Sequence, residues 1–187
     1  MQAPQTVGAF AHPARNVDAL GIQSGFSVAD FGSGSGAYVL AVAEQLKGSG
    51  HVYAVDVQKD LLRRISNEAK KRGFKNVEVI WADLDTPNSS KLAPRLLDLV
   101  LASNVLFQVS DKKALLSEAR RVLKTTGRLA IIDWSDSFGN LGPTKEEVVT
   151  REKSIKLAEA AGFGLVKEFS AGAHHYGLIM RPVAVQS

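Results

Sequence analysis

The chain has 187 residues, a formal net charge of +4 and no cysteine. Its length allows one hydrophobic core that removes about 70% of the unfolded surface from water. The lack of cysteine excludes disulfides, thiolate metal sites and a cysteine nucleophile, and it fits a reducing cytoplasm, where we expect the protein to act. No window approaches the roughly 18 apolar residues of a membrane helix, so we expect no membrane span.

The first predicted elements surround a glycine-rich turn. A short helix is expected over residues 13–20 and a buried strand over residues 28–31. Every second residue after this strand is a glycine, which lets the backbone turn sharply and lie against a ligand: Gly32, Gly34 and Gly36. A helix is expected to follow over residues 38–46. A strand, a glycine turn and a helix in this order indicate a nucleotide-binding half-site.

Two acids accompany this turn. Residues 51–57 form the next predicted strand, and its carboxyl end carries Asp56, where a carboxylate can accept hydrogen bonds from both hydroxyls of a ribose. Asp30 lies two residues before Gly32, where it would repel a pyrophosphate but suits a ligand with a positive ammonium group. The alternatives are a helix-capping or loop carboxylate for Asp30 and a solvated strand-end acid for Asp56. The spacing G-x-G-x-G also departs from the G-x-G-x-x-G of dinucleotide sites, which disfavours an NAD-binding oxidoreductase.

The string DFGSGSG at residues 30–36 resembles the first motif of class I S-adenosylmethionine-dependent methyltransferases, and Asp56 matches their ribose-binding acid. After a helix over 59–72 and a strand over 76–81, Asp83 stands where the family binds the adenine amino group. An apolar strand over 96–101 leads into residues 102–108, which look like the family's fourth motif, at the methionine end of the cofactor. The resemblance implies S-adenosylmethionine as the cofactor, held by one set of residues: Asp30, Gly32, Gly34, Gly36, Asp56, Val57, Asp83, Leu84 and Asn104.

The resemblance extends through the next helix and strand. Residues 111–123 form an amphipathic helix capped near Ser110 or Asp111, and residues 125–127 turn it into a strand over 128–134. The pattern LLSEARRVLKTTGRLAIIDW is close to methyltransferases of the ubiquinone/menaquinone-biosynthesis type. The family implies an α/β fold, a Rossmann-like doubly wound sheet of seven strands with the last strand antiparallel and helices on both faces.

The C-terminal part is expected to complete this sheet. Residues 135–144 form a polar loop that either moves over a bound substrate or is a surface turn. A helix over 145–161 is opened by Pro143-Thr144 and ended by Gly162, and strands over 164–171 and 176–185 form a hairpin. We expect one methyltransferase domain over residues 1–187, made of an N-terminal helical or lid segment (1–24), a cofactor-binding core (25–134) and a C-terminal helix and hairpin (135–187).

Residues that act on the methyl acceptor are harder to find. His174 and His175 lie just before the last strand and are the candidate catalytic bases; the alternative is one surface histidine and one packed against the core. Trp134, at the end of the fifth predicted strand, is expected to wall the pocket, and its neighbour Asp133 either faces the cleft or anchors a loop. Three further side chains have two possible positions each. His12 lies either at the cleft or in an N-terminal tail, and Tyr38 and Phe107 pack either against the cofactor or in the core.

Missing motifs narrow the choice of acceptor. Enzymes that methylate the amines of bases or of glutamine carry an Asn/Asp-Pro-Pro-Tyr/Phe sequence, and residues 102–105 read ASNV instead, which disfavours this activity. Arsenite-type methylation works through cysteine thiols, which the chain lacks, so we exclude it as well. Hydrophobic residues expected around the cleft favour a small or apolar acceptor: Phe10, Leu106, Phe107, Trp134 and Phe138. The leading prediction is methyl transfer from S-adenosylmethionine to a small molecule, at carbon or oxygen, without a metal.

Two alternatives stay open at this point. A sequence pI near 9.4 allows an RNA or protein methyltransferase, although nucleic acid is not the favoured partner, and such an enzyme would need a contiguous basic patch at the cleft mouth. The chain could also be a module that binds S-adenosylmethionine or another nucleotide without transferring a methyl group, because its cofactor motifs are clearer than any catalytic residue.

Overall fold

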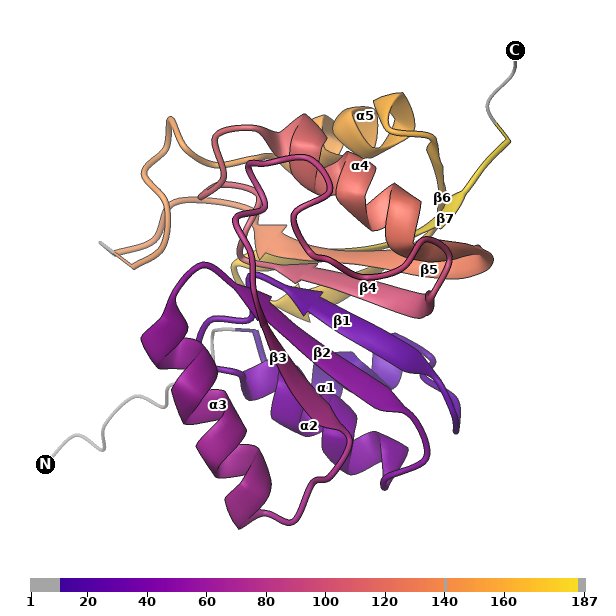
Figure 1. The fold of residues 1–187 in the computed structure, drawn as a ribbon. Coiled ribbons are helices and arrows are strands. Elements are labelled where there is room, and N and C mark those ends of the chain that lie inside the picture. The colour runs from indigo at the N-terminus through magenta and orange to yellow at the C-terminus, as the bar shows by residue number, and fades with distance from the viewer. Residues whose placement is uncertain (1–10, 140, 185–187) are drawn as a thin grey trace, which may run out of the picture.

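A computed structural model describes residues 11–139 and 141–184. Seven strands of these residues form one sheet in the order β3-β2-β1-β4-β5-β7-β6 (Figure 1). The strands are β1 (Ser27–Phe31), β2 (His51–Asp56), β3 (Val77–Trp81), β4 (Leu97–Ser103), β5 (Leu123–Trp134), β6 (Phe163–Gly172) and β7 (His175–Pro182). The helices are α1 (Pro13–Ala19), α2 (Ala37–Leu46), α3 (Lys59–Lys71), α4 (Lys112–Val122) and α5 (Arg151–Ala160).

The sheet reverses its strand order between β1 and β4. From β1 the chain continues outward to β2 and β3 on one side, and it returns through β4 and β5 on the other, all with parallel pairing. β7 pairs antiparallel with both β5 and β6, which confirms the predicted antiparallel last strand. In such a sheet a ligand binds at the carboxyl ends of the strands, next to the point of reversal. This edge lies on the left-hand side of Figure 1.

Helices cover both faces of the sheet, as the resemblance predicts. α1, α2 and α3 pack on one face around Val39, Leu62 and Leu101, and α4 and α5 pack on the other around Leu116 and Ala158 (Figure 1). The central strand β4 is buried along both faces except at Asp98, which explains its continuous apolar sequence. None of the helices in the described part of the chain is long and apolar enough to span a membrane.

Element boundaries depart from the prediction in three places. The turn predicted at residues 125–127 is wrong, because β5 already begins at Leu123, which pairs with Leu97, and residues 124–127 form an irregular segment before Arg128 pairs with Leu99. The helix predicted from residue 145 begins only at Arg151, because Thr150 caps it by accepting a hydrogen bond from the Lys153 amide at 3.3 Å. β7 ends at Pro182, and residue 185 lies outside the described residues.

The predicted cap of α4 is confirmed at one of its two candidate positions. The Asp111 carboxylate accepts a hydrogen bond from the Ala114 amide at 2.9 Å. The Asp111 amide in turn donates to the Asp85 carboxylate at 2.7 Å, and the Asp85 amide donates to Asp83 at 3.0 Å. These bonds join the loop after β3 to the start of α4. They fix the position of Asp83, which the resemblance assigns to adenine.

Candidate active site

The glycine turn after β1 lies close to the neighbouring strand ends. The amides of Gly32 and Ser33 both donate to the Val55 carbonyl, at 2.8 and 3.0 Å. Gly32 has a φ of +76°, and a Cβ at this position would lie 2.5 Å from Cγ2 of Val105 in the loop after β4. Gly36, with a φ of +81°, is the N-cap of α2. The turn therefore needs glycine both for its backbone angles and for its contact with the β4 loop.

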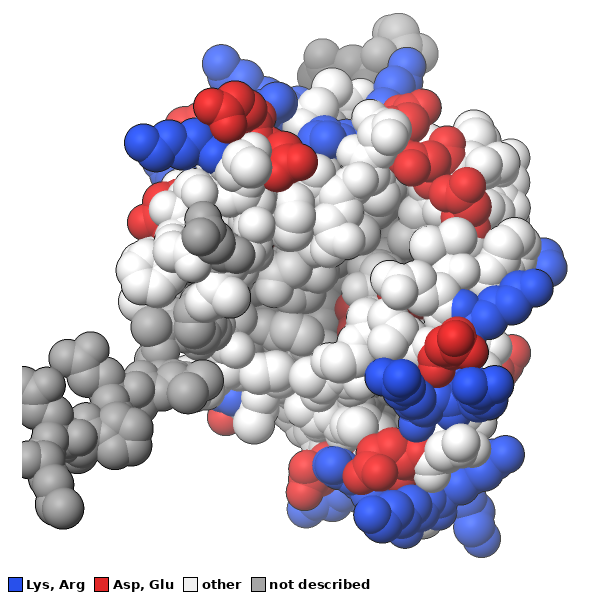
Figure 2. Space-filling view, turned by 90° about the vertical axis from the view of Figure 1, so that its left-hand side faces the viewer, with Lys and Arg blue, Asp and Glu red and all other residues white. Residues whose placement is uncertain are grey.

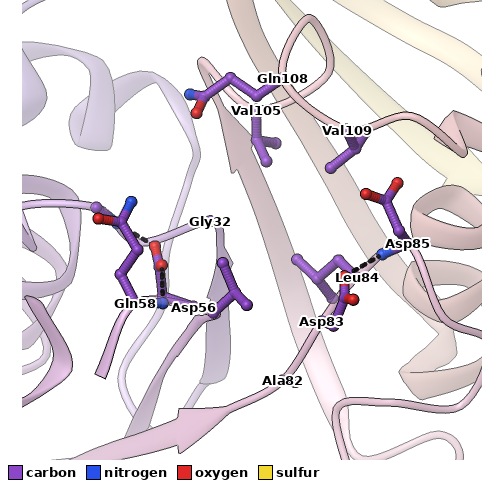
Figure 3. Close-up of a pocket in the computed structure, with 12 residues that line it drawn as sticks. Gly32, Asp56, Gln58, Ala82, Asp83, Leu84, Asp85, Val105, Gln108 and Val109 are labelled. Atoms are coloured by element: carbon purple, nitrogen blue, oxygen red, sulfur yellow. Dashed lines mark hydrogen bonds between the residues drawn. The ribbon is translucent and has the colours of Figure 1, made fainter. Parts of the chain in front are cut away.

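The Asp56 carboxylate organises the ribose end of the predicted site. Asp56 is buried at the end of β2, and its Oδ2 accepts a hydrogen bond from the Gly34 amide while its Oδ1 accepts one from the Gln58 amide, both at 2.8 Å (Figure 3). A carboxylate has about four acceptor positions, so these two bonds leave capacity for two hydroxyl donors. Asp56 thus holds the two loops together and still presents oxygens to a ligand.

A first pocket of about 300 Å³ opens beside Asp56. Figure 3 shows Asp56 and Gln58 on one side of it and Asp83, Leu84 and Asp85 on the other, with the loop after β4 above. Its walls combine the carboxyl groups of these acids with apolar surfaces from Val57, Leu84, Val105 and Val109. The full lining also includes Gly32, Gly34, Ala82 and Gln108. A flat heteroaromatic ring with polar edges suits this combination.

A second pocket of about 290 Å³ continues from the first, because both are lined by Gly32, Gly34 and Gln108. Asp30 lines it and is only 3% exposed. Its Oδ1 has no hydrogen-bond partner among the described residues, and the same holds for Ser33 Oγ and Asn104 Oδ1. Burial, together with the charge of Asp56, raises the pKa of Asp30 from 3.8 to about 7. An unpartnered buried carboxyl in a pocket is a site for a cationic group.

A third pocket of about 330 Å³ adjoins the second, since Ala11 and Asn104 line both. Its remaining lining residues are Trp134, Leu141, Gly142 and His175. The His175 ring is buried against Trp134, with 4.3 Å between the ring centroids, and neither ring nitrogen has a hydrogen-bond partner among the described residues. Burial, and to a lesser extent His174, lowers the pKa of His175, so its imidazole is neutral near pH 7.

The two candidate histidines have different surroundings. His175 lies in the third pocket, whereas His174 is absent from its lining. The Nδ1 of His174 is 2.9 Å from the Asp136 carboxylate, and its ring stacks on Phe138 with 4.0 Å between centroids. Of the two candidate bases, the structure places only His175 at the third pocket. His12 is exposed at the N-cap of α1, and Phe10 lies outside the described residues.

The structure distinguishes between the two hypotheses for Asp133. Its buried carboxylate accepts hydrogen bonds from the Leu106 amide at 3.1 Å and from the Trp134 amide at 2.8 Å. Asp133 therefore anchors the loop after β4. Burial raises the pKa of Asp133 from 3.8 to about 7, against the lowering effect of these backbone bonds. Trp134 lines the third pocket, as predicted, whereas Leu106 is fully buried in the core.

Several residues of the site carried no clear signal in the sequence. Gln108 lines the first two pockets, and its Nε2 donates to the Asn104 carbonyl at 2.5 Å, which braces Asn104 in a left-handed conformation with a φ of +52°. Buried Asn16 of α1 donates to the Tyr38 hydroxyl and to the Ala171 carbonyl, both at 2.9 Å. Tyr38 thereby lines the second pocket while it packs in the core. Gln108 lies within residues 102–108, which resemble the family's fourth motif, whereas Asn16 lies outside every motif named above.

Lysines and arginines lie away from the centre of this face. Figure 2 looks onto the carboxyl edge of the sheet and shows a central hollow with an uncharged rim, while lysines, arginines and acids alternate around the periphery. No lysine or arginine lines any of the three pockets. The contiguous basic patch that an RNA methyltransferase would need is therefore not found around the pockets in the described part of the chain.

Comparison with known proteins decides the family. A family model described as a methyltransferase domain matches residues 22–163. The chain belongs to this family. A solved structure of a SAM-dependent methyltransferase from Aquifex aeolicus is 28% identical, covers 97% of this chain and 94% of its own, and has a TM-score of 0.84. The chain is therefore a class I S-adenosylmethionine-dependent methyltransferase by family and by fold.

Curated relatives add chemical variety. Aklanonic acid methyltransferase DauC from Streptomyces sp. (strain C5) is 29% identical over 116 residues, which are 62% of this chain and 51% of that protein. Demethylmenaquinone methyltransferase from Listeria welshimeri is 32% identical over 117 residues, 61% of this chain and 47% of that protein. The chain thus spans about half the length of these relatives. The [4+2]-cyclase SpnF has the same fold at 15% identity, with a TM-score of 0.77 and coverage of 97% of this chain and 90% of its own.

The residues present fit S-adenosylmethionine. The unpartnered Oδ1 of Asp30 suits the cofactor's ammonium group, and it would repel the pyrophosphate of a dinucleotide. Asp56 and Asp83, which the resemblance assigns to the ribose and the adenine amino group, both line the first pocket. Of the predicted cofactor set, all members except Gly36 line the first or second pocket. Gly36 acts through the turn, because a Cβ there would lie 2.5 Å from Cγ1 of Ile65.

Proposed function

We propose that the protein transfers a methyl group from S-adenosylmethionine to a small-molecule acceptor, at carbon or oxygen. The observation that carries this proposal is the series of three adjoining pockets along the carboxyl edge of the sheet. The first two suit a nucleoside and an amino acid tail, and the third extends past Asn104 to Trp134 and His175. All three parts of the proposed domain contribute, with Ala11, the glycine turn and His175 coming from successive parts of the chain.

In this proposal the cofactor-binding residues act mainly by fixing orientation. When bound, S-adenosylmethionine supplies an electrophilic methyl group on a sulfonium. Asp56 holds the ribose, Asp30 pairs with the ammonium group, and Asn104 lies at the boundary between the second and third pockets. Fixing the methyl carbon against the acceptor atom lowers the barrier by proximity, without any covalent step on the protein.

His175 is proposed as the base for an acceptor that must lose a proton. Its neutral imidazole can take the proton from the acceptor oxygen or carbon as that atom bonds to the methyl carbon, while the methyl–sulfur bond breaks and sulfur keeps the electron pair. A lowered pKa keeps this imidazole available at neutral pH. His174 is the second candidate base. Its contacts with Asp136 and Phe138 instead support a structural role, in which it holds the loop after β5 in place.

The experiment that tests this function uses methyl-labelled cofactor and a fractionated cell extract. We expect label in the small-molecule fraction and background label in protein and RNA. Label confined to RNA or protein would contradict the small-molecule assignment. The cyclase with this fold illustrates that fold alone does not fix a reaction. No label in any fraction, with intact binding of S-adenosylhomocysteine, would favour a module that binds the cofactor without transferring its methyl group.

The role of His175 is tested with the matched pair His175→Asn and His174→Asn. The substrate is a fresh, unlabelled sample of the extract fraction that accepted label in the experiment above. His175→Asn is expected to lower turnover by about 10²-fold or more while leaving affinity for S-adenosylhomocysteine nearly unchanged. Wild-type turnover should rise with pH through a pKa below 6.5 and then level off, because the neutral base is the active form. If both variants keep full turnover and the pH profile is flat, proximity alone suffices and the histidines are not catalytic.

A further inference from the structure

The acceptor end of the cleft differs from the cofactor end in its charge. Asp30, Asp56, Asp83 and Asp85 all line the first and second pockets. The described residues that line the third pocket are alanine, tryptophan, leucine and glycine, together with two polar side chains, Asn104 and His175. An acceptor in the third pocket therefore meets apolar surface and neutral hydrogen-bonding groups.

No lysine or arginine among the described residues lines the third pocket, so none of them is placed to receive a negative group on the acceptor. The residues outside the described part of the chain, 1–10, 140 and 185–187, contain no lysine or arginine in the sequence, so none of them can supply such a side chain. Lys112 acts on the buried Asp133, and its Nζ donates to the Val109 carbonyl at 2.8 Å, on the lining of the first pocket. It is thus directed to the cofactor end.

The two histidines do not supply a positive charge to the third pocket. His175 is buried and has a lowered pKa, so it is neutral near pH 7. His174 is not among the lining residues of the third pocket, and its Nδ1 is 2.9 Å from the Asp136 carboxylate. A charged acceptor group, of either sign, would lose its hydration in this pocket without gaining an oppositely charged side chain as a partner.

The loop after β5 adds exposed apolar surface beside the third pocket. Phe138 and Leu141, which are 41% and 51% exposed, form a backbone bridge in the loop after β5, and Leu141 lines the pocket. Large side chains that stay exposed at the entrance of a pocket are typical of surfaces that contact apolar ligands. Figure 2 shows mainly uncharged side chains around the central hollow of this face.

We propose that the methyl acceptor is an uncharged, largely apolar molecule that binds in the third pocket, between Trp134, Leu141 and His175. This inference rests on the proposed function and narrows it to a substrate class. In this proposal the third pocket selects uncharged acceptors because its described lining offers no charged side chain to pair with a charged acceptor. Anionic acceptors are rejected because the protein offers them only neutral side chains here and carboxyl groups further along the cleft.

The test separates the small-molecule part of an extract by charge before the assay. Ion-exchange steps at pH 7 yield anionic, cationic and uncharged pools, and each is incubated with methyl-labelled S-adenosylmethionine and the whole protein. We expect at least about tenfold more label in the uncharged pool than in either charged pool, with the product retained on a reversed-phase column. Label mainly in the anionic or cationic pool would overturn the substrate class but leave methyl transfer to a small molecule intact. No label in any pool would overturn the proposed function itself.

A matched pair of variants tests the reason for the selectivity. Leu141→Lys places a cation at the pocket, and Leu141→Met replaces the same side chain with an uncharged one of similar length. The ratio of label in the anionic pool to label in the uncharged pool should rise by about tenfold in Leu141→Lys relative to Leu141→Met. An equal ratio in the two variants would mean that a missing counter-ion does not exclude anions, and the inference would fail.

Discussion

Replacement of Asp56 by alanine tests the cofactor site where its geometry is best defined. Asp56 accepts two backbone hydrogen bonds, from Gly34 and Gln58, and is proposed to accept two more from the ribose hydroxyls. The variant therefore has two separable effects. One is a loss of folding stability from the freed amides, and the other is a loss of cofactor affinity from the missing hydroxyl partners.

The size of each effect follows from the bonds involved. Loss of the charge-assisted bonds to the ribose should weaken binding of S-adenosylhomocysteine by roughly 2 to 4 kcal/mol, which is roughly 30- to 1,000-fold in Kd. Leaving the Gly34 and Gln58 amides without their acceptor should cost about 1 to 3 kcal/mol of unfolding free energy. The fold should survive, because a typical domain has about 5 to 15 kcal/mol of stability.

Asp98→Ala is the matched control. Asp98 also accepts a backbone hydrogen bond, from the Ser27 amide at 2.9 Å, and its other oxygen lies 2.7 Å from Lys124 Nζ. It sits near the start of β4, at the opposite edge of the sheet from the pockets. Urea unfolding should show similar losses of stability in the two variants. Calorimetry with S-adenosylhomocysteine should show weakened binding in Asp56→Ala alone. Equal affinities for both variants would refute the ribose role and leave Asp56 a purely structural residue.

Three further predictions concern the other acids and the choice of ligand. The pKa of Asp30 is about 7, and its ionised form is the one that pairs with the ammonium group. Affinity for S-adenosylhomocysteine should therefore rise roughly tenfold from pH 6 to pH 8, and Asp30→Asn should remove this pH dependence. A flat wild-type profile would contradict the pairing. Asp133 has a raised pKa, so its contribution to stability is present at low pH and is lost as pH rises toward about 7. Asp133→Asn should therefore gain stability relative to the wild type between pH 4 and pH 8 in urea unfolding, and a constant difference would argue against a neutral Asp133. Calorimetry should detect S-adenosylhomocysteine and not NAD, and tighter binding of NAD would overturn the cofactor assignment.

The sheet could be predicted from the sequence because its strands are local and strongly patterned. β1, β2 and β4 are short apolar runs whose ends carry Asp30, Asp56 and Asn104, and each begins within a residue of its predicted start. The wrong boundaries have a common cause. The start of β5 depends on pairing of Leu123 with Leu97 on another strand, and the start of α5 depends on which of several polar residues caps it. Neither choice is visible in local propensity.

The site divides in the same way. Positions fixed by a motif, such as the glycine turn and Asp56, were predicted, because backbone geometry requires those residue types there. Positions fixed by contacts between distant segments were missed. Asn16 is 155 residues from its partner Ala171, and buried Glu118 of α4 holds the Ser90 loop through bonds that no periodicity signals. A buried polar residue in an amphipathic helix is indistinguishable from a solvated one until its partner is known.

A structure of the protein with bound S-adenosylhomocysteine would show whether the three pockets hold adenosine, amino acid tail and acceptor in series. We expect both ribose hydroxyls within hydrogen-bond distance of Asp56, the amino group at Asp30, and the sulfur facing the pocket of Trp134 and His175. A sulfur atom directed away from that pocket, or an amino acid tail that does not reach Asp30, would contradict the account.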